Sequence, residues 1–258
     1  MSTYLNASPI FGPVHSRRLG LSLGVNLMPA SGKICTFDCI YCENGFDGDR
    51  RTSDGYVTLE EVTSALEAKL QEMAAQGTAP DVITLAGNGE PTASPIFPEA
   101  VDATLRLRDA YAPQAQVTVL SNGTCADRPA VHAALMRLDN NIQKLDTVDP
   151  DYIAALDQPV GPYDVSHQVR TFASFQGHVI IQTIFLAGTY RGRDMDNTSD
   201  AYVQPWLDAL AQIRPSAVTV YTIARDTPAL GLRKAAPEVL DGIADRVRAL
   251  GIDCTVSY

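Results

Sequence analysis

The chain of 258 residues lacks long hydrophobic runs, and no stretch approaches the ~18 consecutive apolar residues that a membrane-spanning helix needs. Its first residues, MSTYLNASPIFGPVHSRR, also lack the positively charged start and long apolar run of a signal peptide. Both absences argue against a membrane or secreted protein, and we expect a cytoplasmic one. Hydrophobic residues make up 45% of the chain and charged residues 19%, which is typical of a protein with a folded core.

Positive charge is scarce as well. The chain has 20 lysines and arginines against 30 aspartates and glutamates, so its formal net charge is −10. An acidic chain repels phosphate backbones, which disfavours nucleic acid as a partner. Local basic patches could still form at pairs of arginines, although such pairs are more often solvated than functional. These pairs are Arg17 with Arg18, Arg50 with Arg51, and Arg191 with Arg193.

Cysteine is too sparse and too unevenly spaced for a disulfide framework. The chain has five cysteines, an odd number, and three of them, Cys35, Cys39 and Cys42, lie within eight residues. This C-x-x-x-C-x-x-C spacing suits a metal centre better than disulfides. Three thiolates can bind three irons of one 4Fe-4S cluster, which leaves the fourth iron open to a small bidentate ligand.

A zinc site is the alternative for these cysteines. Structural zinc usually takes four protein ligands, and a fourth ligand is missing nearby in the sequence. His15, Cys125 or Cys254 could reach the three cysteines only through the fold. Cys125 and Cys254 are also too few to hold a second cluster, so we predict one cluster only.

Short apolar or β-branched runs alternate with segments of helical periodicity, which is typical of repeated β-strand and α-helix units and a parallel sheet. The length suits one α/β barrel, and we predict a single domain over residues 1–258, with residues 1–20 as an extension that packs near the site. Strands are predicted at residues 22–28, 81–87, 116–122, 140–146, 178–186, 217–223 and 253–258. Helices are predicted at residues 59–75, 97–108, 130–138, 166–175, 203–213 and 237–250. Residues 157–163 and 189–199 are predicted to be loops.

The cysteine spacing, with the aromatic Tyr41 just before the last cysteine, resembles the radical S-adenosylmethionine (SAM) superfamily, and the resemblance covers nearly the whole chain. Residues 12–26, GPVHSRRLGLSLGVN, are similar to a group of short iron-sulfur oxidoreductases, also described as wyosine-synthesis-related, whose common form has proline in place of His15. The resemblance implies an α/β fold, a partial (β/α)6 TIM-type barrel of parallel strands that is open on one side for a substrate. It also implies two cofactors, one 4Fe-4S cluster and SAM.

The resemblance further implies a SAM site at the ends of two strands. Residues 87–90 form a glycine-rich turn after a strand, and glycine lets backbone approach a ligand closely. In the superfamily the equivalent turn binds the amino group of the methionine moiety. Residues 121 and 122 look placed to contact the methionine carboxylate or the ribose, although an ordinary Asn-Gly turn is the plainer interpretation. The predicted cofactor-binding residues are Tyr41, Gly87, Asn88, Gly89, Glu90, Ser121 and Asn122.

Candidate catalytic residues follow the fourth predicted strand. Alternation puts Lys144 and Asp146 on one face of that strand, and inside a barrel such charges need partners. An active-site role and a structural ion pair are both open. Gln182 on the next strand could reach the same pocket, as could Tyr221 and Arg225. We predict that Lys144, Asp146 and Gln182 contact the substrate or the ribose.

These features predict an enzyme that cleaves SAM reductively to a 5′-deoxyadenosyl radical, which then abstracts hydrogen from a small molecule, a peptide or an RNA base. An electron donor such as flavodoxin or ferredoxin would reduce the cluster. Two alternatives are open: an activating enzyme that forms a glycyl radical on a partner protein, and a non-catalytic regulatory protein that binds zinc or an iron-sulfur cluster.

Overall fold

The computed structural model describes residues 3–16 and 20–258, so Arg17 and Arg18 lie outside the described residues. The chain divides into two compact units. The unit called here the N-terminal unit comprises Leu5–Thr36 and Arg50–Asn141, and the C-terminal unit comprises Met1–Tyr4, Phe37–Asp49 and Ile142–Tyr258. Over the described ranges, no helix is long and apolar enough to cross a membrane.

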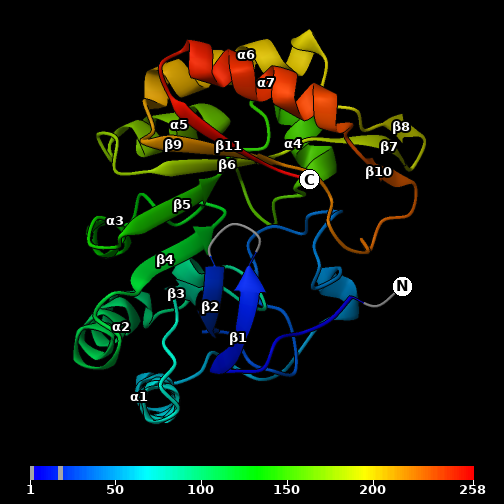
Figure 1. Cartoon of the computed structure of the whole chain (residues 1–258). Coiled ribbons are helices and arrows are strands. Elements are labelled where there is room, and N and C mark those ends of the chain that lie inside the picture. Colours follow the sequence, from blue (N-terminus) through cyan, green and yellow to red (C-terminus); the bar gives the residue numbers. More distant parts are fainter. Residues whose placement is uncertain (1–2, 17–19) are drawn as a thin grey trace. The chain divides into compact units, whose positions relative to one another are not determined.

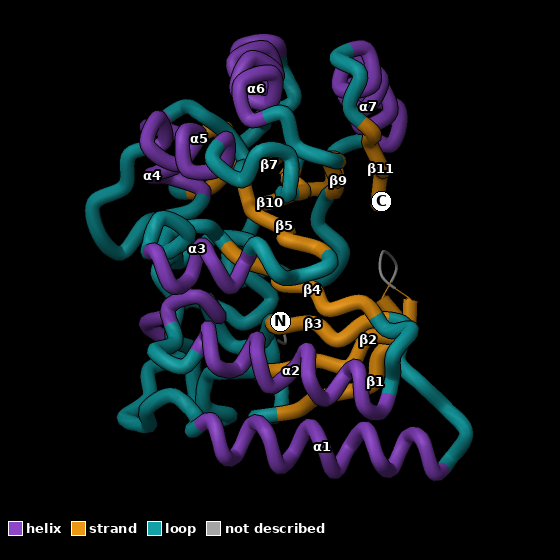
Figure 2. Tube along the Cα trace, turned by 90° about the vertical axis from the view of Figure 1, so that its left-hand side faces the viewer, coloured by secondary structure: helices purple, strands orange, loops and turns teal. Residues whose placement is uncertain are grey.

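The N-terminal unit contains four neighbouring strands in chain order: β1 (Ile10–Ser16), β2 (Gly20–Val25), β3 (Val82–Leu85) and β4 (Gln116–Ser121). β1 pairs antiparallel with β2, whereas β2, β3 and β4 run parallel. Its helices are α1 (Leu59–Ala75), α2 (Phe97–Tyr111) and α3 (Pro129–Leu135), with a short 3₁₀ turn η2 (Pro91–Ala93) after β3. Figure 2 shows α1 and α2 packed side by side. The apolar residues of α1 recur every three or four positions and are buried, so the helix covers the core with one face.

The C-terminal unit is built on four parallel strands. Strand β5 (Asn140–Lys144) enters it from the N-terminal unit and is followed by β6 (Ile180–Ile184), β9 (Ala217–Tyr221) and β11 (Asp253–Ser257), in the sheet order β5, β6, β9, β11. Its α-helices are α4 (Pro150–Leu156), α5 (Val165–Ala173), α6 (Asp200–Ile213) and α7 (Pro237–Ala249). Figure 1 shows α6 and α7 over β9 and β11. The buried Trp206 of α6 donates hydrogen bonds to the Leu145 carbonyl and to Thr183 Oγ1, both at 3.1 Å, which fixes the helix on this sheet.

Three further strands form a small antiparallel sheet in the same unit, in the order β10 (Leu232–Lys234), β7 (Leu186–Tyr190) and β8 (Arg193–Asp194). The short 3₁₀ turn η1 (Asp47–Asp49) also belongs to this unit. A buried cluster of apolar side chains, among them Ile40 and Leu186, joins this sheet to the segment that carries Cys39 and Cys42. The small sheet therefore supports the cysteine segment from within its own unit.

Most predicted elements are present, with α1 matching residues 59–75 to the residue. The predicted loop at residues 189–199 is wrong in part, because it contains the end of β7 and all of β8, joined by a turn at Gly192. The antiparallel strand β1 and the helix α4 were not predicted. β1 contains Gly12 and Pro13, which weaken a strand pattern, and α4 is only seven residues long. Whether residues 1–258 act as a single domain stays a prediction.

Thr58 caps α1 and offers a test of the sequence interpretation of this helix. Its Oγ1 accepts a hydrogen bond from the Glu61 amide (3.2 Å), and the Glu61 carboxylate accepts one from the Thr58 amide (2.7 Å). We expect Thr58→Ala to lower the free energy of unfolding by about 1 kcal/mol, because the helix loses its capping box. Urea denaturation measures the change, with substitution of the exposed Ser53 by alanine as the control. Equal stability of the two variants would contradict the prediction.

Candidate functional site

The segment before Cys35 is held by the glycine-rich turn that follows β3. The Ile34 amide donates to the Asn88 carbonyl (3.0 Å), and the Glu90 amide donates to the Ile34 carbonyl (3.1 Å). Between these bonds Gly89 has φ +145°, and a Cβ there would lie 1.8 Å from the Ile34 oxygen. Only glycine permits this approach. The turn therefore fixes the backbone from which Cys35 projects.

Asn88 secures the same turn with its side chain. It is fully buried, and its Nδ2 donates to the carbonyls of Asn6 (2.9 Å) and Pro29 (3.0 Å). Its Oδ1 accepts a hydrogen bond from the Asn6 amide (2.7 Å). These bonds join the N-terminal segment to the turn.

Glu90 connects the turn after β3 to the end of β4. Its buried carboxylate accepts hydrogen bonds from the Thr92 amide (2.9 Å), the Ser121 hydroxyl (2.8 Å) and the Asn122 amide (2.7 Å). Burial raises the pKa of Glu90, although the hydrogen bonds from Asn122 and Thr92 oppose this shift. The side chains of Glu90 and Ser121 are thus bonded to each other, and both hold the fold of the predicted ligand site.

Asn122 lies beside the first cysteine. Its Nδ2 donates to Thr36 Oγ1 (2.9 Å) and lies 3.8 Å from Cys35 Sγ, while its Oδ1 accepts a hydrogen bond from Thr124 Oγ1 (2.8 Å). The structure thus brings three predicted features of the N-terminal unit together: the first cysteine, the glycine-rich turn and the end of β4.

The segment that carries Cys39 and Cys42 is fixed within the C-terminal unit. The Asp38 amide donates to the Asp157 carbonyl (3.0 Å), and the Ile40 amide donates to the Leu156 carbonyl (2.9 Å). The Cys42 amide donates to the Cys39 carbonyl (3.1 Å), which closes a turn between the two cysteines. The fully buried Ile40 side chain anchors this turn in the core.

Cys39 is buried and contacts two ionisable side chains, Lys144 and Asp157. The Lys144 ammonium lies 3.1 Å from Cys39 Sγ and 2.6 Å from Tyr41 Oη, and the Tyr41 hydroxyl donates to Asp146. The Cys39 thiol donates to Asp157 Oδ1 at 3.4 Å. Burial and the Asp146 charge raise the pKa of Tyr41, so its hydroxyl stays protonated at neutral pH. Burial and Asp146 also raise the pKa of Asp157.

Asp157 was missed by the sequence analysis, because it reaches Cys39 from a position 118 residues later in the chain and no local pattern signals it. Gln182 lies opposite Lys144 in the register of β5 and β6, so both side chains are on one face of the sheet. Arg225, another candidate for this pocket, forms an ion pair with Glu43 at 2.7 Å. Glu43 directly follows Cys42 in the sequence. The catalytic roles of Lys144, Asp146 and Gln182 stay predictions.

The donor set at the cysteines fits an iron-sulfur cluster. All three thiols are free of disulfides, Cys35 and Cys42 are partly exposed, and a fixed ammonium stands beside Cys39. Across the described residues, no three His, Cys, Asp or Glu side chains are already gathered around one point. Soft thiolate ligands bind the iron of an iron-sulfur cluster better than they bind a hard cation, and a nearby positive charge offsets the negative charge of such a cluster.

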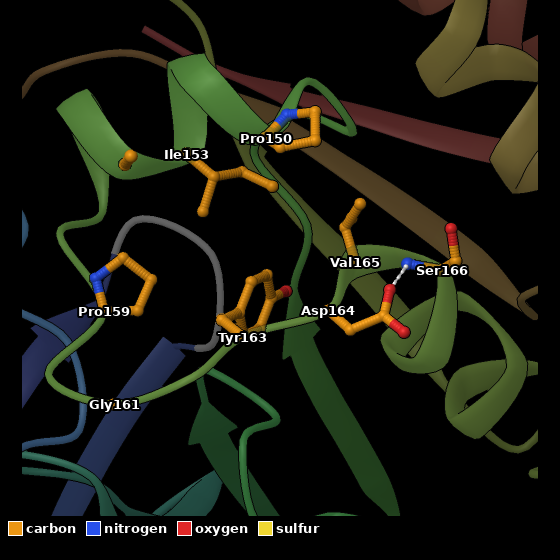
Figure 3. Close-up of a pocket in the computed structure, with 9 residues that line it drawn as sticks. Pro150, Ile153, Pro159, Gly161, Tyr163, Asp164, Val165 and Ser166 are labelled. Carbon is orange, nitrogen blue, oxygen red and sulfur yellow. Dashed lines mark hydrogen bonds between the residues drawn. The ribbon is translucent and has the colours of Figure 1, made fainter.

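A pocket of about 500 Å³ lies between α4, the loop that follows it and the start of α5, and Figure 3 shows its apolar side chains. Pro159 in its wall forms a bridge with Phe37, and the Tyr163 ring packs edge-on against Phe37 at 5.3 Å between centroids. None of the predicted site residues lines this pocket. It is lined by Pro150, Ile153, Ala154, Pro159, Gly161, Tyr163, Asp164, Val165 and Ser166.

Comparison with known proteins places the chain among curated relatives. No family model matches it. A UPF0026 protein of Helicobacter pylori strain J99 is 30% identical over 224 residues, which is 85% of this chain and 68% of that protein. A UPF0026 protein of Synechocystis sp. strain PCC 6803 is 28% identical over 223 residues, which is 85% of this chain and 77% of that protein.

Solved structures with a similar fold are radical SAM proteins. A radical SAM methyltransferase from Sphaerobacter thermophilus has a TM-score of 0.68 at 20% identity, and the match covers 92% of this chain and 66% of that chain. SuiB of Streptococcus suis, solved with bound SAM, has a TM-score of 0.62 at 12% identity, and the match covers 91% of this chain and 50% of that one. This chain therefore spans half to two thirds of the length of these proteins. At such identities the likeness shows the fold, and it confirms the predicted α/β class of the radical SAM partial barrel.

The contact between Gly89 and Ile34 gives a test of how the site is held. We expect Gly89→Ala to lower the free energy of unfolding by about 2 kcal/mol or more, because the backbone of the turn must move away from Ile34. Gly55→Ala is the matched control, since a Cβ at Gly55 meets nothing within 4 Å. Urea denaturation of both variants measures the difference. If Gly89→Ala unfolds at the same urea concentration as Gly55→Ala, the close contact of Gly89 with Ile34 does not hold the segment before Cys35.

Proposed function

The chain belongs to the family of UPF0026 proteins, and we propose on this premise, and on its radical SAM fold, that it is a radical SAM enzyme. One observation carries the proposal: three cysteines in a C-x-x-x-C-x-x-C segment, none in a disulfide, with the backbone before Cys35 and the backbone around Cys39 both fixed by hydrogen bonds. Cys35, Cys39 and Cys42 would hold the 4Fe-4S cluster, and assembly would draw the three thiols together around it.

The bound cluster would supply one electron to SAM and cleave it to methionine and a 5′-deoxyadenosyl radical, which abstracts hydrogen from the substrate. The residues of the chain would bind SAM and orient it. We propose that the main chain of Gly87 and Gly89 contacts the methionine moiety, because the side chains of Asn88 and Glu90 are engaged in the fold. Asn122, beside Cys35, would contact the same ligand near the iron.

A small molecule or a peptide is the substrate class that we propose. The net charge of −10 disfavours RNA, since counterion release from phosphates needs clustered basic groups. One protein of similar fold, SuiB, has been solved with its precursor peptide SuiA. The cysteines of the chain suffice for one cluster only, so no second cluster could pass on an electron. A separate one-electron donor such as flavodoxin or ferredoxin would therefore reduce the cluster.

The proposal predicts SAM cleavage that depends on the three cysteines. After anaerobic reconstitution with iron and sulfide, dithionite and SAM should yield 5′-deoxyadenosine, quantified by mass spectrometry. The variant Cys35→Ala, Cys39→Ala, Cys42→Ala should produce at least about 100-fold less, because no iron site remains. Cys254→Ala is the control, since Cys254 lies on β11 and should leave the yield unchanged.

Equal yields from the unsubstituted protein and the triple variant would contradict the proposal. Protein that takes up one zinc ion and no sulfide would contradict it too, and would favour a regulatory zinc protein.

A further inference from the structure

Lys144 stands at the end of β5 with its ammonium enclosed by protein groups. Nζ lies 3.1 Å from Cys39 Sγ and 2.6 Å from Tyr41 Oη. The carboxylates of Asp157 and Asp146 follow at 3.7 and 3.8 Å. Only 17% of the Lys144 side chain is exposed, against 4% for Asp157 and 0% for Asp146.

The surroundings keep this ammonium charged. Lysine carries a positive charge at neutral pH, and the carboxylates of Asp146 and Asp157 lie 3.8 and 3.7 Å from the Lys144 ammonium. A buried charge is tolerated only when it is paired and hydrogen-bonded, and the two carboxylates meet that condition. The result is a permanent positive charge within hydrogen-bond distance of a cysteine sulfur.

The position of Lys144 is also rigid. Lys144 and Gln182 are partners in the register of β5 and β6, and the Leu145 amide donates to the Gln182 carbonyl (3.2 Å). An ammonium has three N–H donors. Cys39 and Tyr41 each accept from Lys144, and the carboxylates of Asp146 and Asp157 lie around it. The donors of Lys144 are thus directed at the cysteine segment and its neighbours.

We propose that Lys144 is a positioning residue for the Cys39 ligand, whose hydrogen bond and fixed charge at the Cys39 sulfur raise the reduction potential of the cluster. This inference rests on the proposed function. Reduction of the oxidised 4Fe-4S cluster by one electron adds one negative charge to the cluster and its thiolates. A neighbouring ammonium stabilises the reduced form more than the oxidised form, because hydrogen bonds to the sulfurs and local charge set the potentials of such clusters.

The test is a redox titration of the reconstituted protein without SAM, with dithionite as reductant, dye mediators and the EPR signal of the reduced cluster as the readout. At a potential where half of the unsubstituted clusters are reduced, Lys144→Met should lower the ratio of reduced to oxidised cluster about tenfold, a shift of about 59 mV for a one-electron couple. Lys144→Arg keeps the positive charge, so its cluster should have a reduction potential close to that of the unsubstituted protein. Lys144→Gln keeps a hydrogen-bond donor without the charge, so its reduction potential should lie between those of Lys144→Met and Lys144→Arg. This variant still tests the inference if Lys144→Met binds iron poorly.

Lys234→Met is the matched control, because it removes the same charge from an exposed position on β10 and should leave the potential unchanged. An unchanged potential in loaded Lys144→Met and Lys144→Gln would overturn this inference alone. If those variants bind SAM more weakly at an unchanged potential, Lys144 contacts the cosubstrate instead. Absence of a redox-active cluster in the unsubstituted protein would overturn the proposed function and this inference together.

Discussion

The backbone of the cysteine segment is hydrogen-bonded just before Cys35 and on both sides of Cys39, and the chemistry proposed for this protein depends on that constraint. Ile34 pairs with the glycine-rich turn in the N-terminal unit, while Asp38 and Ile40 pair with the end of α4 and its following loop in the C-terminal unit. A free eight-residue loop would lose much conformational entropy on gathering three thiolates around one cluster. Bonds already made by the fold reduce that loss at the moment of assembly.

Several side chains predicted to contact SAM also make hydrogen bonds within the protein. The Asn88 side chain joins the turn to Asn6 and Pro29, and the hydrogen bond between Ser121 and Glu90 joins it to the end of β4. Gly89 of this turn approaches Ile34 closely. The polar groups nearest to Cys35 and Cys39 then differ in kind. Asn122 offers a neutral amide at Cys35, whereas Cys39 contacts the Lys144 ammonium, which two carboxylates flank. The surroundings of Cys35 suit a polar ligand, whereas the ammonium beside Cys39 would act on the charge of the proposed cluster.

The sequence predicts the elements and the motifs better than the contacts between them. Periodicity locates α1 to the residue, and the cysteine spacing predicts three metal ligands without any structure. Alternation correctly puts Lys144 and Asp146 side by side, but it does not show that Cys39 and Asp157 complete their surroundings, since these contacts span more than a hundred residues of chain. Pairing partners at such separation are fixed by tertiary packing, which local propensity does not encode. The small sheet of β7, β8 and β10 escaped prediction for the same reason.

The central claim is that Cys35, Cys39 and Cys42 hold a four-iron cluster with one iron left for SAM. Mössbauer spectroscopy of protein reconstituted with ⁵⁷Fe, recorded before and after addition of SAM, tests it most directly. We expect the spectrum of a 4Fe-4S cluster in which the signal of one iron of the four changes when SAM is added, while the other three stay as they were. A spectrum that SAM leaves unchanged, or one without a four-iron cluster, would contradict it.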